Sequence, residues 1–302
     1  MHCTARYGNA RFKRIDTERI QHELEARKIV IVTGFQGINK YDDYSTLGRG
    51  GSDTTAVALA AALHADKCEI YTDVDGVYTA DPRIVKNARK IDEIIYDEML
   101  ELATSGAKVL HNRSVEMAKK YGVELVVRSS LTSEEGTVVK EVVKMEKMLI
   151  TGVAADRNTV RISAIGVKDE PGIAFKIFNT LAKNNINVDI ILQSVGRNGT
   201  KDISFTVSEE DLKEALAILE EKKEVLTIKE LTYSTDVAKV SIVGAGMLSN
   251  PGVAAKMFES LFNSNININM ISTSEIRITV LIDEKDTEKA MIAIHDGFGL
   301  ND

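Results

Sequence analysis

The sequence predicts an α/β fold with a three-layer αβα arrangement in its N-terminal half and two small βαββαβ modules in its C-terminal half. Three observations predict this class. The N-terminal half alternates β-branched runs with helix-forming runs. A glycine-rich loop there leads directly into one of the helix-forming runs. The C-terminal half contains an internal repeat, which indicates two copies of one supersecondary unit.

The alternation in the N-terminal half predicts a parallel sheet with crossover helices. Residues 28–35 are a nearly continuous β-branched run, which is typical of a strand buried on both faces. Residues 53–65 lack Gly and Pro and predict a helix, and residues 67–72 predict the next strand. These three segments therefore read as a βαβ unit. Further helices and one further strand are expected at 97–104, 114–121 and 123–128.

The glycine-rich loop, residues 45–56, reads Ser-Thr-Leu-Gly-Arg-Gly-Gly-Ser-Asp-Thr-Thr-Ala. Its three glycines remove side chains from a short loop, and Ser52 is expected to cap the helix that follows. Backbone N–H groups and the positive end of the helix dipole would gather at this point, where they suit a phosphate or a carboxylate. Arg49 adds a fork of donors that matches an oxyanion. The alternative is a tight turn with an ordinary cap.

A second candidate loop, residues 73–83, is rich in Asp and Gly and follows the strand predicted at 67–72. Both loops are expected to leave the carboxyl ends of strands. Folds of this class bind ligands at that edge of the sheet.

The repeat runs without a gap at a constant offset of 80 residues, from Gly166 to Gly246, and aligns Pro171 with Pro251. Each copy reads strand, Pro-Gly turn, helix, strand, strand, helix. The first copy closes with a strand at 225–233, whereas the second has no closing strand and would leave an open sheet edge.

A spare strand candidate, residues 148–154, precedes the first copy. We expect the second module to borrow it, so that the first module is inserted within the second. The predicted domains are residues 1–146, residues 158–233, and residues 147–157 together with 234–302.

The composition of the 302 residues excludes several classes of protein. The net charge is −7 and no basic stripe carries interleaved aromatics, so no nucleic-acid partner is expected. No run of eighteen apolar residues predicts a membrane span. The polar N-terminus is not a secretory signal, and two isolated cysteines, Cys3 and Cys68, fit a reducing cytoplasm. No His/Cys/Asp cluster predicts a metal site.

Four segments together resemble a known family: residues 45–55, 71–83 (Tyr-Thr-Asp-Val-Asp-Gly-Val-Tyr-Thr-Ala-Asp-Pro-Arg), 106–111 (Gly-Ala-Lys-Val-Leu-His) and 271–276 (Ile-Ser-Thr-Ser-Glu-Ile). With these segments the chain resembles the aspartate kinases, which are amino-acid kinases with tandem ACT regulatory domains. The resemblance covers essentially the whole chain. It implies the C-terminal portion of a three-layer αβα amino-acid-kinase fold, followed by two ferredoxin-like βαββαβ ACT domains.

The resemblance also implies the reaction. The γ-phosphoryl group of ATP, bound with Mg²⁺, would pass to the side-chain carboxylate of L-aspartate and give 4-phospho-L-aspartate, the first step of lysine, threonine and methionine biosynthesis. A carboxylate is already ionised at pH 7, so no general base is needed. Positioning and charge neutralisation then supply most of the catalysis. Lysine and/or threonine would inhibit by feedback, in a homodimer or higher homo-oligomer formed through the ACT domains.

Residue roles follow by resemblance at the matching positions. Arg49 would hold the α-carboxylate of aspartate and Asp53 would lie near its amino group, although Asp53 could equally cap the helix. Gly50, Gly51 and Ser52 would complete the substrate loop. The nucleotide contacts would be Thr72, Asp73, Tyr78, Arg83 and Lys108. The effector contacts would be Asp169, Gly172, Ala174 and Gln193, although from the residues alone Pro171-Gly172 could simply form a turn. His111 is expected to be structural.

The chain departs from the family pattern at its start. The family begins with a strand and a Lys-Phe-Gly-Gly motif whose lysine contacts the transferred group, and nothing here matches it. We therefore expect the N-terminal part of the kinase domain to be missing. The alternative function is a non-catalytic chain that senses amino acids. A further hypothesis is that a separate regulatory subunit starts at Met145. Asp75 stands where the family usually has Pro and is expected to soften its loop.

Overall fold

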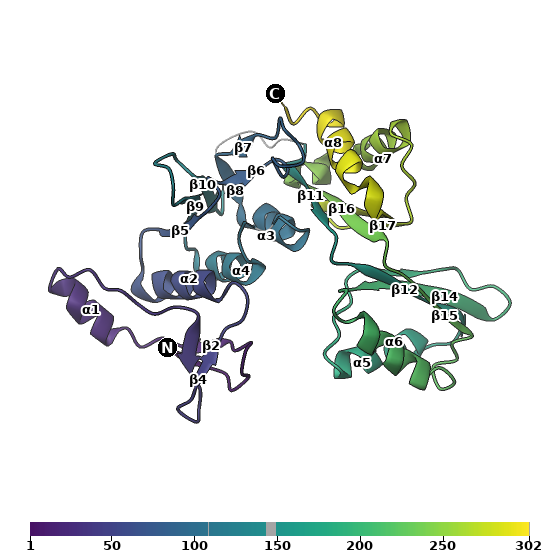
Figure 1. Ribbon diagram of the computed structural model, residues 1–302, viewed down its shortest axis with the longest axis horizontal. Coiled ribbons are helices and arrows are strands. Elements are labelled where there is room, and N and C mark those ends of the chain that lie inside the picture. The colour runs from purple at the N-terminus through teal and green to yellow at the C-terminus, as the bar shows by residue number, and fades with distance from the viewer. Residues whose placement is uncertain (108, 143–148, 302) are drawn as a thin grey trace.

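The computed structural model describes residues 1–107, 109–142 and 149–301. Figure 1 shows the N-terminal half on one side, in purple and blue, and the first repeat module, residues 160–234, at the opposite side. The second repeat module lies between them. Among the described residues, no helix is long and apolar enough to cross a membrane.

A small mixed sheet forms the N-terminal end of the chain and carries the glycine loop. Its strands lie in the order β2-β1-β3-β4, and helix α1 (Glu18–Glu25) stands apart from them. The strands are β2 (Phe12–Arg14), β1 (His2–Cys3), β3 (Gln36–Ile38) and β4 (Tyr44–Thr46). Cys3, Ala10 and Leu47 form its small core. The glycine loop therefore follows the hairpin β3–β4.

The prediction of a strand at residues 28–35 is wrong. This run is irregular and pairs with no strand of the described chain. Its side chains are not buried, since Ile29 is 95% exposed and Ile31 is 94% exposed. A β-branched run becomes a strand only where neighbouring strands accept its backbone hydrogen bonds. The βαβ unit predicted from this run is therefore absent, and the glycine loop does not leave the carboxyl end of a parallel strand.

The main sheet of the N-terminal half has the strand order β5-β9-β10-β8. Strands β5 and β9 are parallel, as are β8 and β10, whereas β9 and β10 are antiparallel. The strands are β5 (Cys68–Thr72), β9 (Leu125–Ser129), β10 (Thr137–Lys140) and β8 (Glu93–Ile95). A short hairpin, β6 (Val77–Tyr78) with β7 (Lys90–Ile91), lies beyond it.

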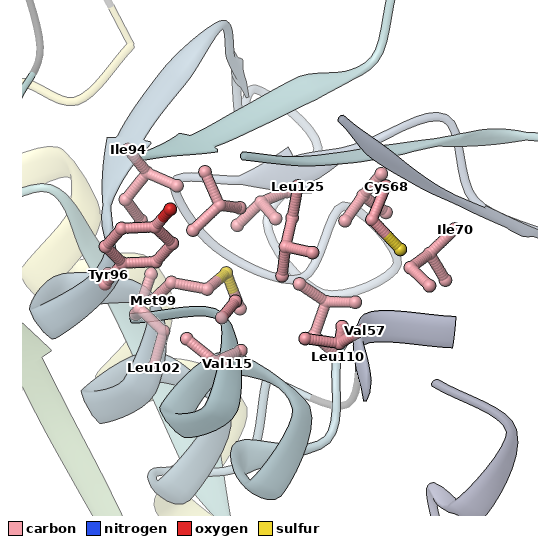
Figure 2. Close-up of a cluster of buried hydrophobic side chains, with 14 of the residues drawn as sticks. Val57, Cys68, Ile70, Ile94, Tyr96, Met99, Leu102, Leu110, Val115 and Leu125 are labelled. Atoms are coloured by element: carbon pink, nitrogen blue, oxygen red, sulfur yellow. The ribbon is translucent and has the colours of Figure 1, made fainter. Parts of the chain in front are cut away.

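Three helices bury their apolar residues against this sheet: α2 (Gly51–Leu63), α3 (Tyr96–Thr104) and α4 (Asn112–Tyr121). The predicted helices are thus confirmed, each starting one or two residues earlier than expected. Figure 2 shows Val57 of α2, Met99 of α3 and Val115 of α4 meeting Leu125 of the sheet. This core fixes where α2 begins, and with it the glycine loop.

The first module is a βαββαβ unit with an antiparallel sheet of order β13-β14-β12-β15. Its elements are β12 (Val160–Lys168), α5 (Ile173–Lys183), β13 (Ile191–Gln193), β14 (Thr200–Val207), α6 (Leu212–Glu221) and β15 (Glu230–Ser234). Ile177 and Leu181 of α5 pack with Phe205 of β14 and Leu219 of α6 in its core.

The second module has a sheet of order β11-β16-β18-β17, also antiparallel. Its elements are β16 (Val237–Val243), α7 (Val253–Asn263), β17 (Met270–Thr273), β18 (Arg277–Asp283), α8 (Thr287–Gly297), and the short turns η1 (Ala245–Ser249) and η2 (Glu284–Asp286). Strand β11 (Gly152–Asp156) stands where β15 stands in the first module. The segment before the first module therefore pairs with the second module, as expected. Strand β11 begins and ends later in the sequence than the expected strand at 148–154, and residue 148 lies outside the described residues.

The two modules contact one another through a lysine and a small apolar cluster. Lys239 of β16 lies 3.0 Å from a carboxylate oxygen of Asp156 and 2.7 Å from one of Asp189. Ile190 of the first module packs on Val237 and neighbouring residues of the second. The lysine side chain is only 12% exposed. Its charge therefore stabilises the contact between modules more than an ordinary surface pair would.

We expect Lys239→Met to lower the free energy of unfolding by about 2 kcal/mol, because two half-buried carboxylates would lose their cation. Burial would lower the pKa of Lys239, but Asp156 and Asp189 outweigh it and raise the pKa. Because the pKa is raised, the charged lysine stabilises the fold fully at pH values below the unfolded pKa of about 10.4. This stabilisation is lost as the pH rises through the higher pKa of the folded state. Urea unfolding at pH 7 and pH 9 should show the same loss.

The matched control is Lys223→Met, which removes an exposed pair between Lys223 and Glu220, 2.8 Å apart on the first module. It should cost less than about 0.5 kcal/mol. Equal losses in the two variants would show that the Lys239 contact contributes no more than a surface pair.

Candidate active site

The glycine loop closes onto the start of α2 through its backbone. Gly50 is the N-cap with φ +66°, and the Gly51 N–H donates to the Gly48 carbonyl at 3.0 Å. The Thr54 N–H donates to the Gly50 carbonyl, also at 3.0 Å. The expectation that Ser52 caps the helix is wrong. Ser52 lies inside the first turn, because left-handed Gly50 starts the helix two residues before the predicted start, and its hydroxyl donates to Asp53 at 3.3 Å.

This geometry leaves an anion-binding position at the helix start. An α-helix begins with four N–H groups that lack intrahelical partners. Here they belong to residues 50–53, since the Thr54 N–H makes the first intrahelical bond, to Gly50. The Gly51 N–H donates to the loop, and within the described chain no protein acceptor meets those of Ser52 and Asp53, which remain for a ligand. Arg49 directly precedes the N-cap Gly50 and its side chain is exposed, whereas Asp53, in the first turn, is half-buried. A molecule that carries both a carboxylate and an ammonium group fits this pairing.

His111 and Arg113 hold the loop from the start of α4. A Cβ atom at position 50 would overlap the His111 ring, so only glycine fits beneath it. Burial, followed by the charge of Arg113, lowers the pKa of His111, and its ring accepts a hydrogen bond from the Arg113 N–H at 3.3 Å. The His111 ring is therefore neutral at pH 7 and structural, as expected.

Arg113 is a site-supporting residue that sequence reasoning missed. Its guanidinium donates to the Leu47 carbonyl at 2.8 Å and to the Ala10 carbonyl at 3.1 Å. A cation in the first turn of a helix opposes the helix dipole. That unfavourable position was the signal, since it indicates that Arg113 has a partner elsewhere in the fold.

The second loop follows β5 and is anchored at both ends. The Thr72 hydroxyl donates to Asp73 at 3.0 Å, and the Thr72 carbonyl accepts from the Ser130 N–H at 2.8 Å. The Tyr78 hydroxyl donates to both Asp75 oxygens, at 3.0 and 3.1 Å. Burial and Asp75 raise the pKa of Tyr78. Asp75 therefore holds the Tyr78 hydroxyl, and the expectation that it softens the loop stays a prediction.

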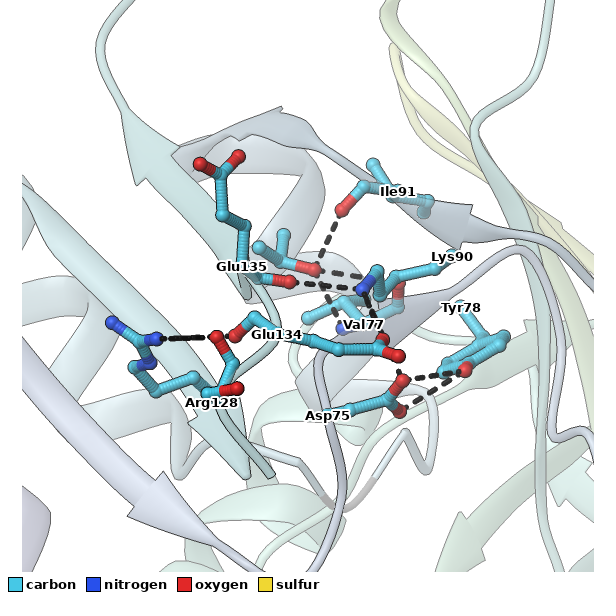
Figure 3. A network of polar contacts seen from close by, with 10 residues as sticks. Asp75, Val77, Tyr78, Lys90, Ile91, Arg128, Glu134 and Glu135 are labelled. Carbon is cyan, nitrogen blue, oxygen red and sulfur yellow. Dashed lines mark hydrogen bonds and ion pairs between the residues drawn. The ribbon is translucent and has the colours of Figure 1, made fainter. Parts of the chain in front are cut away.

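A polar network ties this loop to residues 130–136 (Figure 3). Lys90 donates to the Glu135 carbonyl at 2.8 Å and to the Glu134 carboxylate at 3.4 Å, and it lies 3.9 Å from Asp75. Arg128 donates to the Glu134 carbonyl at 3.1 Å. Lys90 and Arg128 therefore hold the segment after β9 next to the loop that carries Asp75 and Tyr78.

Arg83 is oriented by a neighbouring carboxylate. Its guanidinium nitrogens donate to Asp81 at 2.7 and 3.0 Å, while the side chain remains 87% exposed. Arg83 lowers the pKa of Asp81, so that carboxyl group stays ionised. Lys108 lies outside the described residues, as does Met145. Among the described residues, no three acidic, histidine or cysteine side chains converge to hold a metal ion.

The expected effector residues lie around the start of α5. Gly172 is the N-cap with φ +90°, and Ala174 lies in the first turn. Asp169 pairs with Lys201 at 3.1 Å and lies against Gly196, on the connection between β13 and β14. Gln193 is exposed on the edge strand β13. Asp169 is thus brought next to the segment that follows Gln193.

Comparison with known proteins follows the same division of the chain. Sequence models of the amino acid kinase family match residues 2–129, and those of the ACT domain match residues 160–222 and 240–298. An aspartokinase from Bacillus sp. (strain MGA3) is 53% identical over 98% of this chain and 72% of its own length. The chain belongs to the aspartokinase family. The predicted family and fold class are thereby confirmed, and the chain is a kinase that transfers a phosphoryl group.

Solved structures agree with this membership. Escherichia coli aspartokinase III in complex with aspartate and ADP, in its R-state, is 30% identical with a TM-score of 0.83, over 98% of this chain and 67% of that one. The same enzyme in complex with lysine and aspartate, in its T-state, is 31% identical with a TM-score of 0.75, over 99% and 67%. The non-catalytic alternative is therefore not favoured.

Proposed function

We propose that this aspartokinase transfers the γ-phosphoryl group of ATP to the side-chain carboxylate of L-aspartate. The product would be 4-phospho-L-aspartate, and the step would be the first of lysine, threonine and methionine biosynthesis. The observation that carries the proposal is the pairing of Arg49 with the open N–H groups at the start of α2. That arrangement suits an amino acid, and the E. coli relative was solved with aspartate.

In this proposal the chain positions two anions and neutralises their charge. Arg49 and the N–H groups of Ser52 and Asp53 bind the α-carboxylate of aspartate, and the Asp53 carboxylate takes its ammonium group. Gly50 and Gly51 have no side chains and so allow the carboxylate to approach the backbone closely. The side-chain carboxylate is then free to attack, and because it is already ionised no base takes part. Holding it in line with the γ-phosphorus lowers the entropic cost of reaction.

We place the nucleotide at the loop after β5, and the E. coli relative solved with ADP supports nucleotide binding as such. Thr72, Asp73 and Tyr78 would surround the adenosine part, while Arg83 and Lys108 would contact the phosphates. Arg83 reaches a phosphate either from its outer edge or by leaving Asp81. Magnesium enters with ATP as part of the substrate, because Mg²⁺ commonly binds through phosphates and waters.

For regulation, we place lysine and/or threonine at Asp169, Gly172, Ala174 and Gln193. The E. coli relative was solved with lysine in its T-state. The exposed edge strand β13, with Ile191 in it and Val195 just after it, would pair with a second copy in a homodimer or larger oligomer. The predicted domain boundaries, the cytoplasmic location suggested by Cys3 and Cys68, and a separate subunit starting at Met145 remain proposals.

We expect Gln193→Ala and Asp169→Ala to raise the effector concentration for half-inhibition by about tenfold while kcat changes less than twofold. Each substitution removes about 1.4 kcal/mol of polar contact, which is a factor of ten in binding. Thr273→Ala is the matched control, because Thr273 is the equivalent of Gln193 in the second module. Inhibition that is unchanged in both variants, or equally weakened in the control, would remove this site assignment.

The experiment that tests the function is aspartate-dependent turnover of MgATP by this chain, together with calorimetric binding of MgATP, lysine and threonine. Turnover that requires L-aspartate and gives an acyl phosphate supports the proposal, and trapping the product with hydroxylamine identifies the carboxyl phosphate. Effector binding without any nucleotide binding would support the sensing function instead and would overturn the catalytic one.

A further inference from the structure

Thr79 joins the nucleotide loop to the second module through its carbonyl and its hydroxyl group. It is 1% exposed and follows Tyr78 directly. Its N–H donates to the Arg89 carbonyl at 2.9 Å, and its carbonyl accepts from the Val153 N–H of β11 at 2.7 Å. Its hydroxyl oxygen accepts from the Arg89 N–H at 3.0 Å and lies 2.9 Å from His295 Nε2.

His295 is the residue of α8 that reaches this point, and it is fully buried. Because the Thr79 oxygen already accepts from Arg89, its own proton is best used as a donor to His295 Nε2. The ring is then neutral with its proton on Nδ1, which lies 4.0 Å from an Asp296 carboxylate oxygen, beyond hydrogen-bond distance. Burial lowers the pKa of His295 against the opposing effect of Asp296, which agrees with a neutral ring at pH 7.

Two further bonds connect the same loop to the end of α8. The Arg89 side chain donates to the Leu300 carbonyl at 3.0 Å, and the Asn87 amide lies 3.4 Å from Asp296. Ala80 and Val85 of the loop are buried in the core of the second module itself. Figure 1 shows α8 beside the hairpin β6–β7. The segment between Tyr78 and Lys90 therefore packs as part of the regulatory module.

We infer that His295 is a positioning residue for the nucleotide: through the Thr79 hydroxyl it sets the placement of Tyr78 and Arg83, and so the affinity of this chain for ATP. This inference rests on the proposed nucleotide site. Tyr78 precedes Thr79 and Arg83 comes four residues after it, so a shift of α8 moves both contacts together. A change in the second module thereby alters ATP affinity without touching the aspartate loop.

The test uses His295→Leu and Thr79→Val, which remove the two ends of the hydrogen bond at nearly constant volume. We expect each to raise KM for ATP, and the calorimetric Kd for MgATP, by about tenfold, while KM for aspartate and kcat change less than twofold. His295→Gln and Thr79→Ser keep a hydrogen-bonding group at each end and should recover most of the affinity. The double variant should lose no more than either single variant.

Glu101→Gln is the matched control, since it weakens the 3.0 Å pair between Glu101 of α3 and Arg277 in the same interface, away from the loop. It should leave KM for ATP within twofold. Unchanged ATP affinity in folded Thr79→Val and His295→Leu would overturn the inference, as would parallel losses for ATP and aspartate. If the unsubstituted chain binds no MgATP, the proposed nucleotide site itself fails and the inference with it.

Discussion

Arg49→Met should lower kcat/KM for aspartate by roughly 10²–10³ with little change in stability. Arg49 is the one cationic residue of the glycine loop, next to the N-cap of α2, and in our proposal its guanidinium binds the α-carboxylate. Losing a two-pronged, charge-assisted contact costs about 3–4 kcal/mol when the carboxylate is left unpaired. The side chain is exposed, so the fold loses little by its removal.

The measurement is steady-state kinetics with aspartate varied at saturating MgATP, alongside thermal unfolding. Arg49→Lys keeps the charge and loses the fork, so it should recover only part of the rate. Arg19→Met removes an exposed arginine that pairs with Glu23 on α1, and it should leave kcat/KM unchanged. Full activity in Arg49→Met would place aspartate somewhere other than this loop.

Gly50→Ala should destabilise the chain and abolish aspartate binding together. A residue with a Cβ atom at φ +66° costs about 1–2 kcal/mol. The new methyl group would also overlap the His111 ring, and overpacking of this kind adds about 1–3 kcal/mol. Because Gly50 is the N-cap of α2, relief of the overlap must shift the N–H groups of Ser52 and Asp53.

Gly122→Ala separates the two costs. Gly122 ends α4 at the same φ of +66°, and a Cβ atom there would meet nothing within 4 Å. In urea unfolding, Gly122→Ala should therefore lose about 1–3 kcal/mol less stability than Gly50→Ala. Adding His111→Ala to Gly50→Ala should recover part of the difference. Equal losses at the two glycines would mean that the His111 ring moves aside without cost.

Local sequence patterns are sufficient to predict the elements that have a clear periodicity and Gly or Pro residues at their ends. Residues 51–63 form a helix because helix-forming residues follow a glycine cap and bury one side on the sheet. The constant repeat offset and the paired Pro-Gly turns indicated two equal modules, and each turn starts a helix at a glycine with positive φ. The glycine loop and the Asp-rich loop are likewise recognisable as candidate sites from their residues alone.

Only the tertiary structure decided which groups those elements meet. Residues 28–35 have the composition of a buried strand, yet pairing is a long-range property, and no described strand accepts their hydrogen bonds. Arg113 beneath the glycine loop and His295 against Thr79 join positions that are far apart in sequence. Sequence periodicity reports how a segment folds on itself. Burial, charge pairing and the partner of each polar group depend on distant segments, and these decide how this kinase holds its substrates.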